Sequence, residues 1–235
     1  LLKYIYKYEK KRLENYEKKQ SKKFNNIIFV NKKDIKNSTI FNKKKVKIIG
    51  NGTYSKKNIF LNNRIKNNII FFGNINSLAN RTACIDFIEN YLPILKKKYP
   101  NIEFKIFGNC SRFLKFYFKH KGINVTSNIR SLKDYCKNTL AGICNVKIHS
   151  GLQNKILDYT SIGLPVIINK SSSNFDFLDG KNILKYNSKS EFFSKLKKLT
   201  SSRNFRNQIS KINYNKTKKH YSWNKILNSY SLLIK

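Results

Sequence analysis

The stretch NIIFFGNINSLANRTACIDFIENYLPILKKKYPNIEFKIFG, residues 68–108, holds two short apolar runs on either side of a longer amphipathic segment. We predict strands at 68–73 and 102–108, because continuous apolar runs of this length are typical of strands buried on both faces of a parallel sheet. We predict one helix over 79–98, whose core face is formed by Ala83, Ile85, Phe87, Ile88, Tyr91 and Leu92. The stretch therefore predicts a β-α-β unit.

The same alternation continues to the end of the chain. We predict strands at 122–127, 141–146, 165–169 and 182–186 and helices at 111–120, 131–138, 152–162, 189–199, 201–219 and 222–234. Repeated β-α units with short connections predict an α/β fold, a Rossmann-like parallel sheet with helices on both faces. Ligands of such sheets bind beyond the carboxyl ends of the strands, where Gly73, Gly108 and Gly151 lie.

A separate set of elements precedes this sheet. We predict a helix over 2–24, a strand over 25–31, a helix over 32–41 and a strand from residue 45 into Gly50-Asn51-Gly52, which is a turn signal. Residues 53–66 have low hydrophobicity and no clear period, so we predict a linker there. The chain contains no methionine and opens within a predicted helix, so we expect upstream residues to be missing.

The formal net charge is +37, from 49 basic and 12 acidic residues. Such an excess indicates nucleic acid or an anionic membrane face as a partner. Alternatively, the abundance of lysine, asparagine and isoleucine reflects A/T-rich codons, which would place lysine on every exposed surface. Both interpretations are compatible with a pocket for a nucleotide diphosphate, because such a pocket gains from positive potential.

The four cysteines, Cys84, Cys110, Cys136 and Cys144, form no CxxC pair, and no histidine has ligand spacing to them. A structural zinc and disulfides are therefore not indicated, which favours a reducing compartment. No apolar run approaches the roughly 20 residues needed to span a bilayer, and no signal peptide is visible. We expect a cytoplasmic protein, with peripheral contact at the cytoplasmic membrane face as a further expectation.

Candidate chemistry concentrates in SGLQNKILDYTSIGLPVII, residues 150–168. Gly151 can let a ligand approach the backbone, and the first N–H groups of the following helix attract anions. Lys155 adds a positive charge suited to phosphate oxygens, and Asp158 can accept hydrogen bonds from vicinal hydroxyls. The alternative is an exposed Lys155–Asp158 pair on a helix surface, which would contribute about 0.2–0.5 kcal/mol.

The stretch resembles the signature helix of glycosyltransferase family 4, the group 1 glycosyl transferases, which commonly reads G-I-Q-N-K-hydrophobic-L-E. Other segments are similar to that family in the same order along the chain: KIIGNGTY, FFGNINSLAN, LPILKKKYPNIEFKIFG, NVTSNIRSLKDYCKN and HYSWNKIL. The resemblance implies a GT-B fold, in which two Rossmann-like domains face each other across a cleft. It implies that residues 1–52 belong to the first, acceptor domain, 53–66 to a linker, 67–220 to the donor-binding domain and 221–235 to a helix that crosses back.

The resemblance also implies roles for individual residues. Lys155 and Asp158 are expected as catalytic residues, with Lys155 and Lys147 on the diphosphate and Asp158 on the ribose of the donor. Further donor contacts are expected from Gly73, Asn80, Gly151, Gln153 and Asn154, and base contacts from Ile129 and Arg130. The family has two glutamates eight positions apart, and here those positions hold Ser150 and Asp158.

The function implied is transfer of a sugar from a nucleotide-diphosphate-sugar donor to a carbohydrate or lipid-linked acceptor, in polysaccharide or glycoconjugate synthesis. The resemblance implies retention of anomeric configuration, no metal and no cofactor, since the nucleotide-sugar is the substrate. Two alternatives stay open: a basic nucleic-acid-binding module, and a catalytically silent glycosyltransferase-like half, which Ser150 in place of the first acid suggests.

Overall fold

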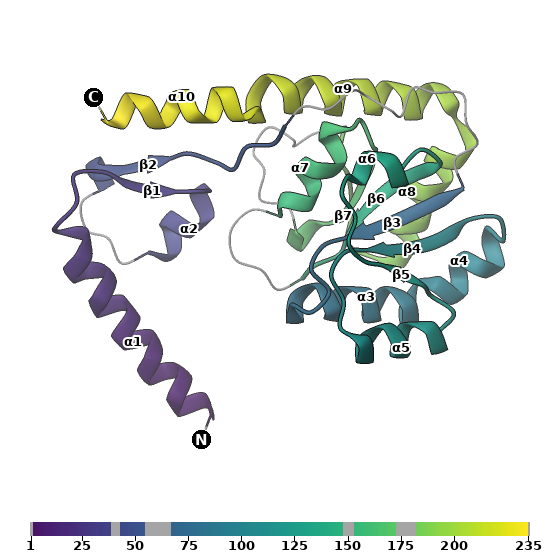
Figure 1. The fold of residues 1–235 in the computed structure, drawn as a ribbon, viewed down its shortest axis with the longest axis horizontal. Coiled ribbons are helices and arrows are strands. Elements are labelled where there is room, and N and C mark those ends of the chain that lie inside the picture. Colours follow the sequence, from purple (N-terminus) through teal and green to yellow (C-terminus); the bar gives the residue numbers. More distant parts are fainter. Residues whose placement is uncertain (1, 39–42, 55–66, 148–152, 173–181, 235) are drawn as a thin grey trace.

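The structure is a computed structural model that describes residues 2–38, 43–54, 67–147, 153–172 and 182–234. Its larger part is built on six parallel strands (Figure 1): β3 (Asn68–Phe72), β4 (Glu103–Phe107), β5 (Val125–Thr126), β6 (Thr139–Cys144), β7 (Val166–Asn169) and β8 (Leu184–Tyr186). Their order across the sheet is β5-β4-β3-β6-β7-β8. The α/β fold with a Rossmann-like parallel sheet is therefore confirmed.

This strand order places β3 beside β6, although residues 73–138 lie between the end of β3 at Phe72 and the start of β6 at Thr139. The chain runs outward from β3 through β4 to β5, then returns and runs outward on the other side through β6 to β8. The connections on the two sides therefore diverge above β3 and β6. In doubly wound sheets this switch point is where ligands bind.

Helices cover both faces of the sheet (Figure 1). Their bounds are α3 (Leu78–Asn90), α4 (Leu92–Lys98), α5 (Arg112–His120), α6 (Leu132–Tyr135), α7 (Asn154–Ser161), α8 (Lys189–Ser201) and α9 (Arg203–Tyr221). In Figure 1, α3, α4 and α5 lie below the sheet, whereas α7 and α9 lie above it. The α7 helix packs directly against α9, where the hydroxyl of Thr217 donates to that of Thr160 at 2.7 Å.

The single helix predicted over 79–98 is wrong in one respect, because the structure has two helices that meet at Tyr91. Pro93 stands in the first turn of α4, where the missing proline N–H costs no helical hydrogen bond. Other predicted elements are present but shorter. The strand expected at 122–127 has two residues, and the helix expected at 2–24 ends at Ser21.

The core of this part is rich in aromatic rings. The Phe192 ring of α8 lies 5.6 Å from that of Phe87 on α3, 5.1 Å from Tyr91 and 5.2 Å from Tyr186 on β8, all in edge-to-face geometry. Such edge-to-face pairs add to the stabilisation from burial. This cluster fixes α3 and α8 on the sheet, and α3 then carries one wall of the site described below.

The smaller part consists of α1 (Leu2–Ser21), β1 (Ile27–Phe29), α2 (Lys32–Asn37), a 3₁₀ turn (Lys43–Lys45) and β2 (Val46–Ile48), with β1 and β2 paired in parallel. The last helix, α10 (Trp223–Ile234), runs beside this sheet (Figure 1), and Asn26 Nδ2 donates to the Leu233 carbonyl at 3.5 Å. The domain limits 1–52, 53–66, 67–220 and 221–235 stay a prediction.

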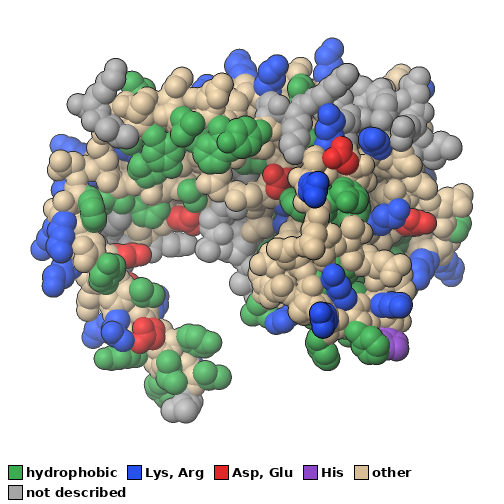
Figure 2. All heavy atoms as spheres, in the orientation of Figure 1, with side chains coloured by type: hydrophobic (Ala, Val, Ile, Leu, Met, Phe, Trp, Pro, Cys, Tyr) green, Lys and Arg blue, Asp and Glu red, His purple; other side chains and the backbone are tan. Residues whose placement is uncertain are grey.

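The α1 helix has no buried residue, and Figure 2 shows hydrophobic and basic side chains exposed along it. On the face in Figure 2, Lys and Arg are spread over both parts of the molecule and do not gather in one patch. None of the helices within the described ranges is long and apolar enough to cross a membrane.

Candidate active site

The site begins where β3 and β6 separate. The two strands are paired at Asn68–Thr139, Ile69–Ala141 and Ile70–Gly142. At the last of these pairs, the ring of Tyr159 from α7 lies over Gly142, and a Cβ atom added at Gly142 would overlap the ring. The Tyr159 Oη atom accepts a hydrogen bond from the Phe72 N–H at 2.7 Å and donates to the Ile143 carbonyl at 3.4 Å. Beyond the last strand pair, the Tyr159 hydroxyl therefore bonds one backbone group of β3 and one of β6.

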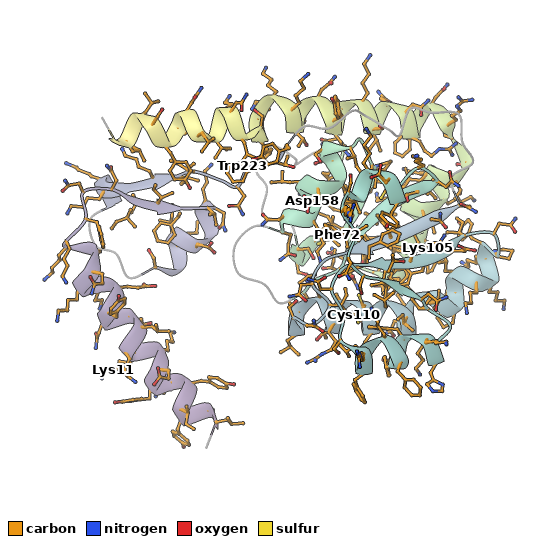
Figure 3. All side chains as sticks on the ribbon, in the orientation of Figure 1. Lys11, Phe72, Lys105, Cys110, Asp158 and Trp223 are labelled. Atoms are coloured by element: carbon orange, nitrogen blue, oxygen red, sulfur yellow. The ribbon has the colours of Figure 1, made fainter. Side chains whose placement is uncertain are left out.

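Tyr159 is fully buried, and this burial raises its pKa well above the usual value. The hydroxyl therefore keeps its proton at neutral pH and can act as donor and acceptor together. Because one side chain of α7 bonds both strands, the helix is held at a fixed place above the switch point. Figure 3 shows the result, with Asp158 on α7 and Phe72 at the end of β3 in the centre of the molecule.

The next residue toward the start of α7 that faces β3 is Lys155. Its exposed fraction is 6%, its Nζ atom lies 3.8 Å from the centroid of the Phe71 ring, and it donates to Asn80 Oδ1 at 2.6 Å. Burial lowers the pKa of the ammonium group, an effect that nearby groups, Asp158 among them, partly oppose. Within the described ranges, no carboxylate oxygen lies within 4.0 Å of Lys155 Nζ.

A buried ammonium group with only neutral partners is costly, because it has lost water without gaining a counter-charge. The ring face of Phe71 and the amide oxygen of Asn80 offset part of this cost. An anionic ligand would offset much more. The Lys155 side chain is thus buried, and the exposed Lys155–Asp158 surface pair considered as an alternative does not describe it.

Asn80 connects Lys155 to the turn after β3. While its Oδ1 atom accepts from Lys155, its Nδ2 atom donates to the Asn74 carbonyl at 2.9 Å. Gly73 has a φ of 154°, and a Cβ atom there would stand 2.9 Å from Asn80 Nδ2. Glycine at this position therefore permits the turn to pass close to Asn80. The structure brings together three of the predicted site residues: Gly73, Asn80 and Lys155.

The beginning of α7 lies at the same edge of the sheet. Gln153 is the N-cap residue, and its side chain makes no capping hydrogen bond. Asn154, the first helical residue, accepts a hydrogen bond from Asn51 Nδ2 at 2.7 Å, and Asp158 lies half-buried one turn further on. The predicted residues Gly151 and Ser150 lie outside the described residues.

Lys147 occupies a different place from Lys155. It follows β6, its side chain is 59% exposed, and its Nζ atom lies 3.5 Å from Asp86 Oδ1 on α3. Lys147 and Asp86 line a cavity of about 350 Å³ together with Leu78, Ala79, Thr82, Ala83 and Asn145. Ile129 and Arg130 are farther away in the sheet, because they follow β5, the edge strand two places from β3.

Two features of the site were not predicted, Tyr159 and the Asn51–Asn154 contact. Tyr159 occupies a position that is typical of the apolar face of an amphipathic helix. The sequence signal for a close approach of another group to the β6 strand is Gly142, in the middle of that strand. The sequence pattern places Asn51 only in the Gly50-Asn51-Gly52 turn signal. In the described part of the chain, no group of three or more His, Cys, Asp or Glu residues could hold a metal ion.

The arrangement can be compared with known proteins. The family model described as "Glycosyl transferases group 1" matches residues 39–202, more than half of the chain. A search of curated proteins finds no match. Similar solved structures include a variant of S. aureus TarM in complex with fondaparinux, α-GlcNAc-glycerol and UDP (14% identity, TM-score 0.74). They also include Anabaena HepE in complex with UDP and glucose (10%, 0.68) and a glycosyltransferase from Rickettsia africae (13%, 0.68).

The aligned parts cover 94%, 89% and 91% of this chain and 46%, 62% and 65% of those three chains. The chain thus spans about half to two-thirds of the length of these structures. At such low identities the likeness concerns the fold, which is that of GT-B glycosyltransferases. The family match, together with a site at the switch point of that fold, leads to one conclusion. The chain belongs to the group 1 glycosyl transferase family.

Proposed function

We propose that the protein transfers a sugar from a nucleotide-diphosphate-sugar donor, and that the edge formed by α7, β3 and the start of α3 receives the donor diphosphate. The observation that carries this proposal is Lys155, a buried ammonium group whose partners in the described structure are an amide oxygen and an aromatic ring. The N-terminal amides of α7 point to the same edge and favour negative charge.

The chemical task of these groups is to stabilise charge on the departing nucleotide diphosphate. Fixed dipoles and a pre-placed cation act strongly where water is excluded, and they need no metal ion. Asp158 binds the ribose hydroxyls in this scheme, and Ile129–Arg130 lie beside the base. Retention of anomeric configuration and independence from metal are parts of the proposal.

Lys147 plays a secondary part. Its side chain is 59% exposed and that of Asp86 is 23% exposed, and ion pairs in contact with solvent contribute little to stability. Lys147 can therefore exchange Asp86 for a phosphate oxygen at small cost.

The acceptor in this proposal is a carbohydrate or a lipid-linked saccharide, and the product is a polysaccharide or glycoconjugate. A TarM variant was solved with fondaparinux, α-GlcNAc-glycerol and UDP, and HepE was solved with UDP and glucose. We propose a cytoplasmic enzyme whose basic surface allows peripheral contact with an anionic membrane face.

Calorimetry on the intact protein with UDP, GDP and ADP tests the donor site. The unaltered protein is expected to bind one of these nucleotides more tightly than the others. Lys155→Met removes the charge and keeps most of the side-chain length, so we expect affinity to fall about 10- to 100-fold, the range for a hydrogen bond to a charged group. The free energy of unfolding is expected to stay the same or rise, because a buried charge is removed.

The matched control is Lys105→Met, since Lys105 is an exposed lysine paired with Glu103 at 3.0 Å on β4. It should leave nucleotide affinity unchanged. Equal affinity of the Lys155→Met variant and the unaltered protein would contradict the assignment of the site.

The high net charge keeps nucleic-acid binding as a second candidate function. Filter binding of single- and double-stranded nucleic acid across a salt series distinguishes it. A steep salt dependence without any nucleotide preference would favour the basic module. Sugar turnover by the protein would exclude the catalytically silent alternative.

A further inference from the structure

The segment that leaves β2, residues Asn51–Thr53, contacts the larger part of the molecule in two places. At the first, Asn51 Nδ2 donates to Asn154 Oδ1 at 2.7 Å, and these residues are 103 positions apart. Asn154 is the first residue of α7, immediately before Lys155. The chain that joins the two sheets is therefore hydrogen-bonded to the helix at whose start we place the donor diphosphate.

At the second place, Thr53 forms an isolated parallel bridge with Ser222, between α9 and α10. The Thr53 N–H donates to the Tyr221 carbonyl at 2.7 Å, and the Trp223 N–H donates to the Thr53 carbonyl at 3.3 Å. The indole of Trp223 covers Gly52, where an added Cβ would stand 2.6 Å from Cδ2 of the ring. Figure 3 shows Trp223 at the joint between α9 and α10.

These two contacts are parts of one closed path. From Thr53 the path enters the end of α9, runs back along α9 to Thr217, crosses to Thr160 near the end of α7 at 2.7 Å and returns along α7 to Asn154. The far end of α7 is thus held through α9, with both threonines buried. The near end, where the ligand is proposed to bind, is held by Asn51.

We propose that Asn51 is a positioning residue for the transferase reaction, acting through Asn154 to hold the first turn of α7 in place for the donor. This inference rests on the proposed function. Asn51 itself belongs to the segment after β2, so the smaller sheet and the donor edge share one hydrogen bond at the point of ligand binding. Loss of that bond removes one contact of the first turn of α7, where Lys155 still bonds Asn80, and leaves the end of the helix attached through Thr160.

The test is a double-mutant cycle on the full chain with UDP as the probe, measured by calorimetry. Asn51→Ala and Asn154→Ala are each expected to weaken UDP binding about three- to tenfold, the range for one neutral hydrogen bond. The double variant should be no weaker than the weaker single variant, because both changes remove the same contact.

Two variants of Asn51 separate the hydrogen bond from packing. Asn51→Gln keeps the donor group on a side chain with room to adjust beside the exposed Asn154, so it should retain affinity within about twofold. Asn51→Leu keeps the size and removes the donor, so it should match Asn51→Ala. The control is Asn26→Ala, which removes another contact to the C-terminal part, Asn26–Leu233, far from α7 in sequence.

Additive losses in the cycle, or equal losses with glutamine and leucine, would overturn the inference. A loss of melting temperature without a loss of UDP affinity would assign Asn51 a purely structural role and would also overturn it. If Asn51→Ala binds UDP normally while Lys155→Met does not, the proposed function stands and this inference fails. If the unaltered protein binds none of UDP, GDP and ADP, both fail.

Discussion

Lys155 and Lys147 both follow the β6 strand closely, and both were expected to bind the donor diphosphate, yet the structure gives them opposite surroundings. Lys155 is 6% exposed and faces an amide oxygen and a phenyl ring. Lys147 has a side chain that is 59% exposed and faces a carboxylate, Asp86. Within the described ranges, no carboxylate oxygen lies within 4.0 Å of Lys155 Nζ, whereas Lys147 has both solvent exposure and a carboxylate partner.

Under the proposed function, this difference favours Lys155 over Lys147 as the principal phosphate ligand. An exposed lysine beside an aspartate is already satisfied, so an incoming phosphate gains little by replacing either water or Asp86. The described partners of the buried Lys155 are the Asn80 amide oxygen and the Phe71 ring, so under the proposed function a phosphate would add the counter-charge that they do not provide. Among the basic residues of a chain with net charge +37, burial without a carboxylate is the informative property.

The largest effect is expected when the partners of the two lysines are exchanged, so that Lys155 faces a carboxylate and Lys147 faces an amide. Asn80→Asp places a carboxylate beside Lys155 Nζ, where it competes with a phosphate. We expect UDP affinity to fall about 10- to 100-fold.

The reciprocal change, Asp86→Asn, removes the carboxylate from Lys147. It should leave UDP affinity unchanged within about twofold or strengthen it slightly, because a nearby negative charge is lost. Calorimetry on both variants provides the measurement. If Asp86→Asn had the larger effect of the two, Lys147 would be the principal phosphate ligand.

A second change sharpens the comparison by loosening the helix that carries Lys155. Tyr159→Phe leaves the Phe72 N–H without its partner, and an unsatisfied buried donor costs about 1–3 kcal/mol. We expect the free energy of unfolding in urea to fall by this amount. Tyr135→Phe, which changes a more exposed ring on α6, is the control and should have a small effect. An unchanged urea midpoint for Tyr159→Phe would contradict the role given to the hydroxyl.

The smallest effect is expected at the other lysine. A double-mutant cycle of Lys147→Ala and Asp86→Ala should give a coupling energy of about 0.2–1 kcal/mol, as for other exposed pairs. The coupling should vanish in 1 M salt, where the screening length is about 3 Å. A coupling that survives high salt would mean that this pair is effectively shielded from water.

Much of the fold could be predicted from the sequence, because apolar runs such as IIFF in β3 and VII in β7, alternating with amphipathic segments, are typical of strands buried on both faces. The order of β-α units then fixes a parallel sheet. The break at Tyr91 was missed because the apolar period continues through it, and the proline that restarts the helix is compatible with a helical first turn.

The site could be predicted only in part. Glycine after a strand and lysine in the first turn of a helix are local signals, and Gly73 and Lys155 were found from them. The partner of each residue is a tertiary property, since Lys155 meets Asn80 across 75 positions and Lys147 meets Asp86 across 61. The sequence therefore proposed both lysines, Lys147 through the family resemblance, but could not say which one is buried.

The phenol that Tyr159 places over Gly142 has a consequence for how this sheet can vary. No side chain can be introduced at position 142 while the ring remains, and no smaller residue at 159 can bond both strand ends. A side chain at position 142 therefore requires a smaller residue at position 159, so a redesign that adds one must substitute the strand and the helix in a single step.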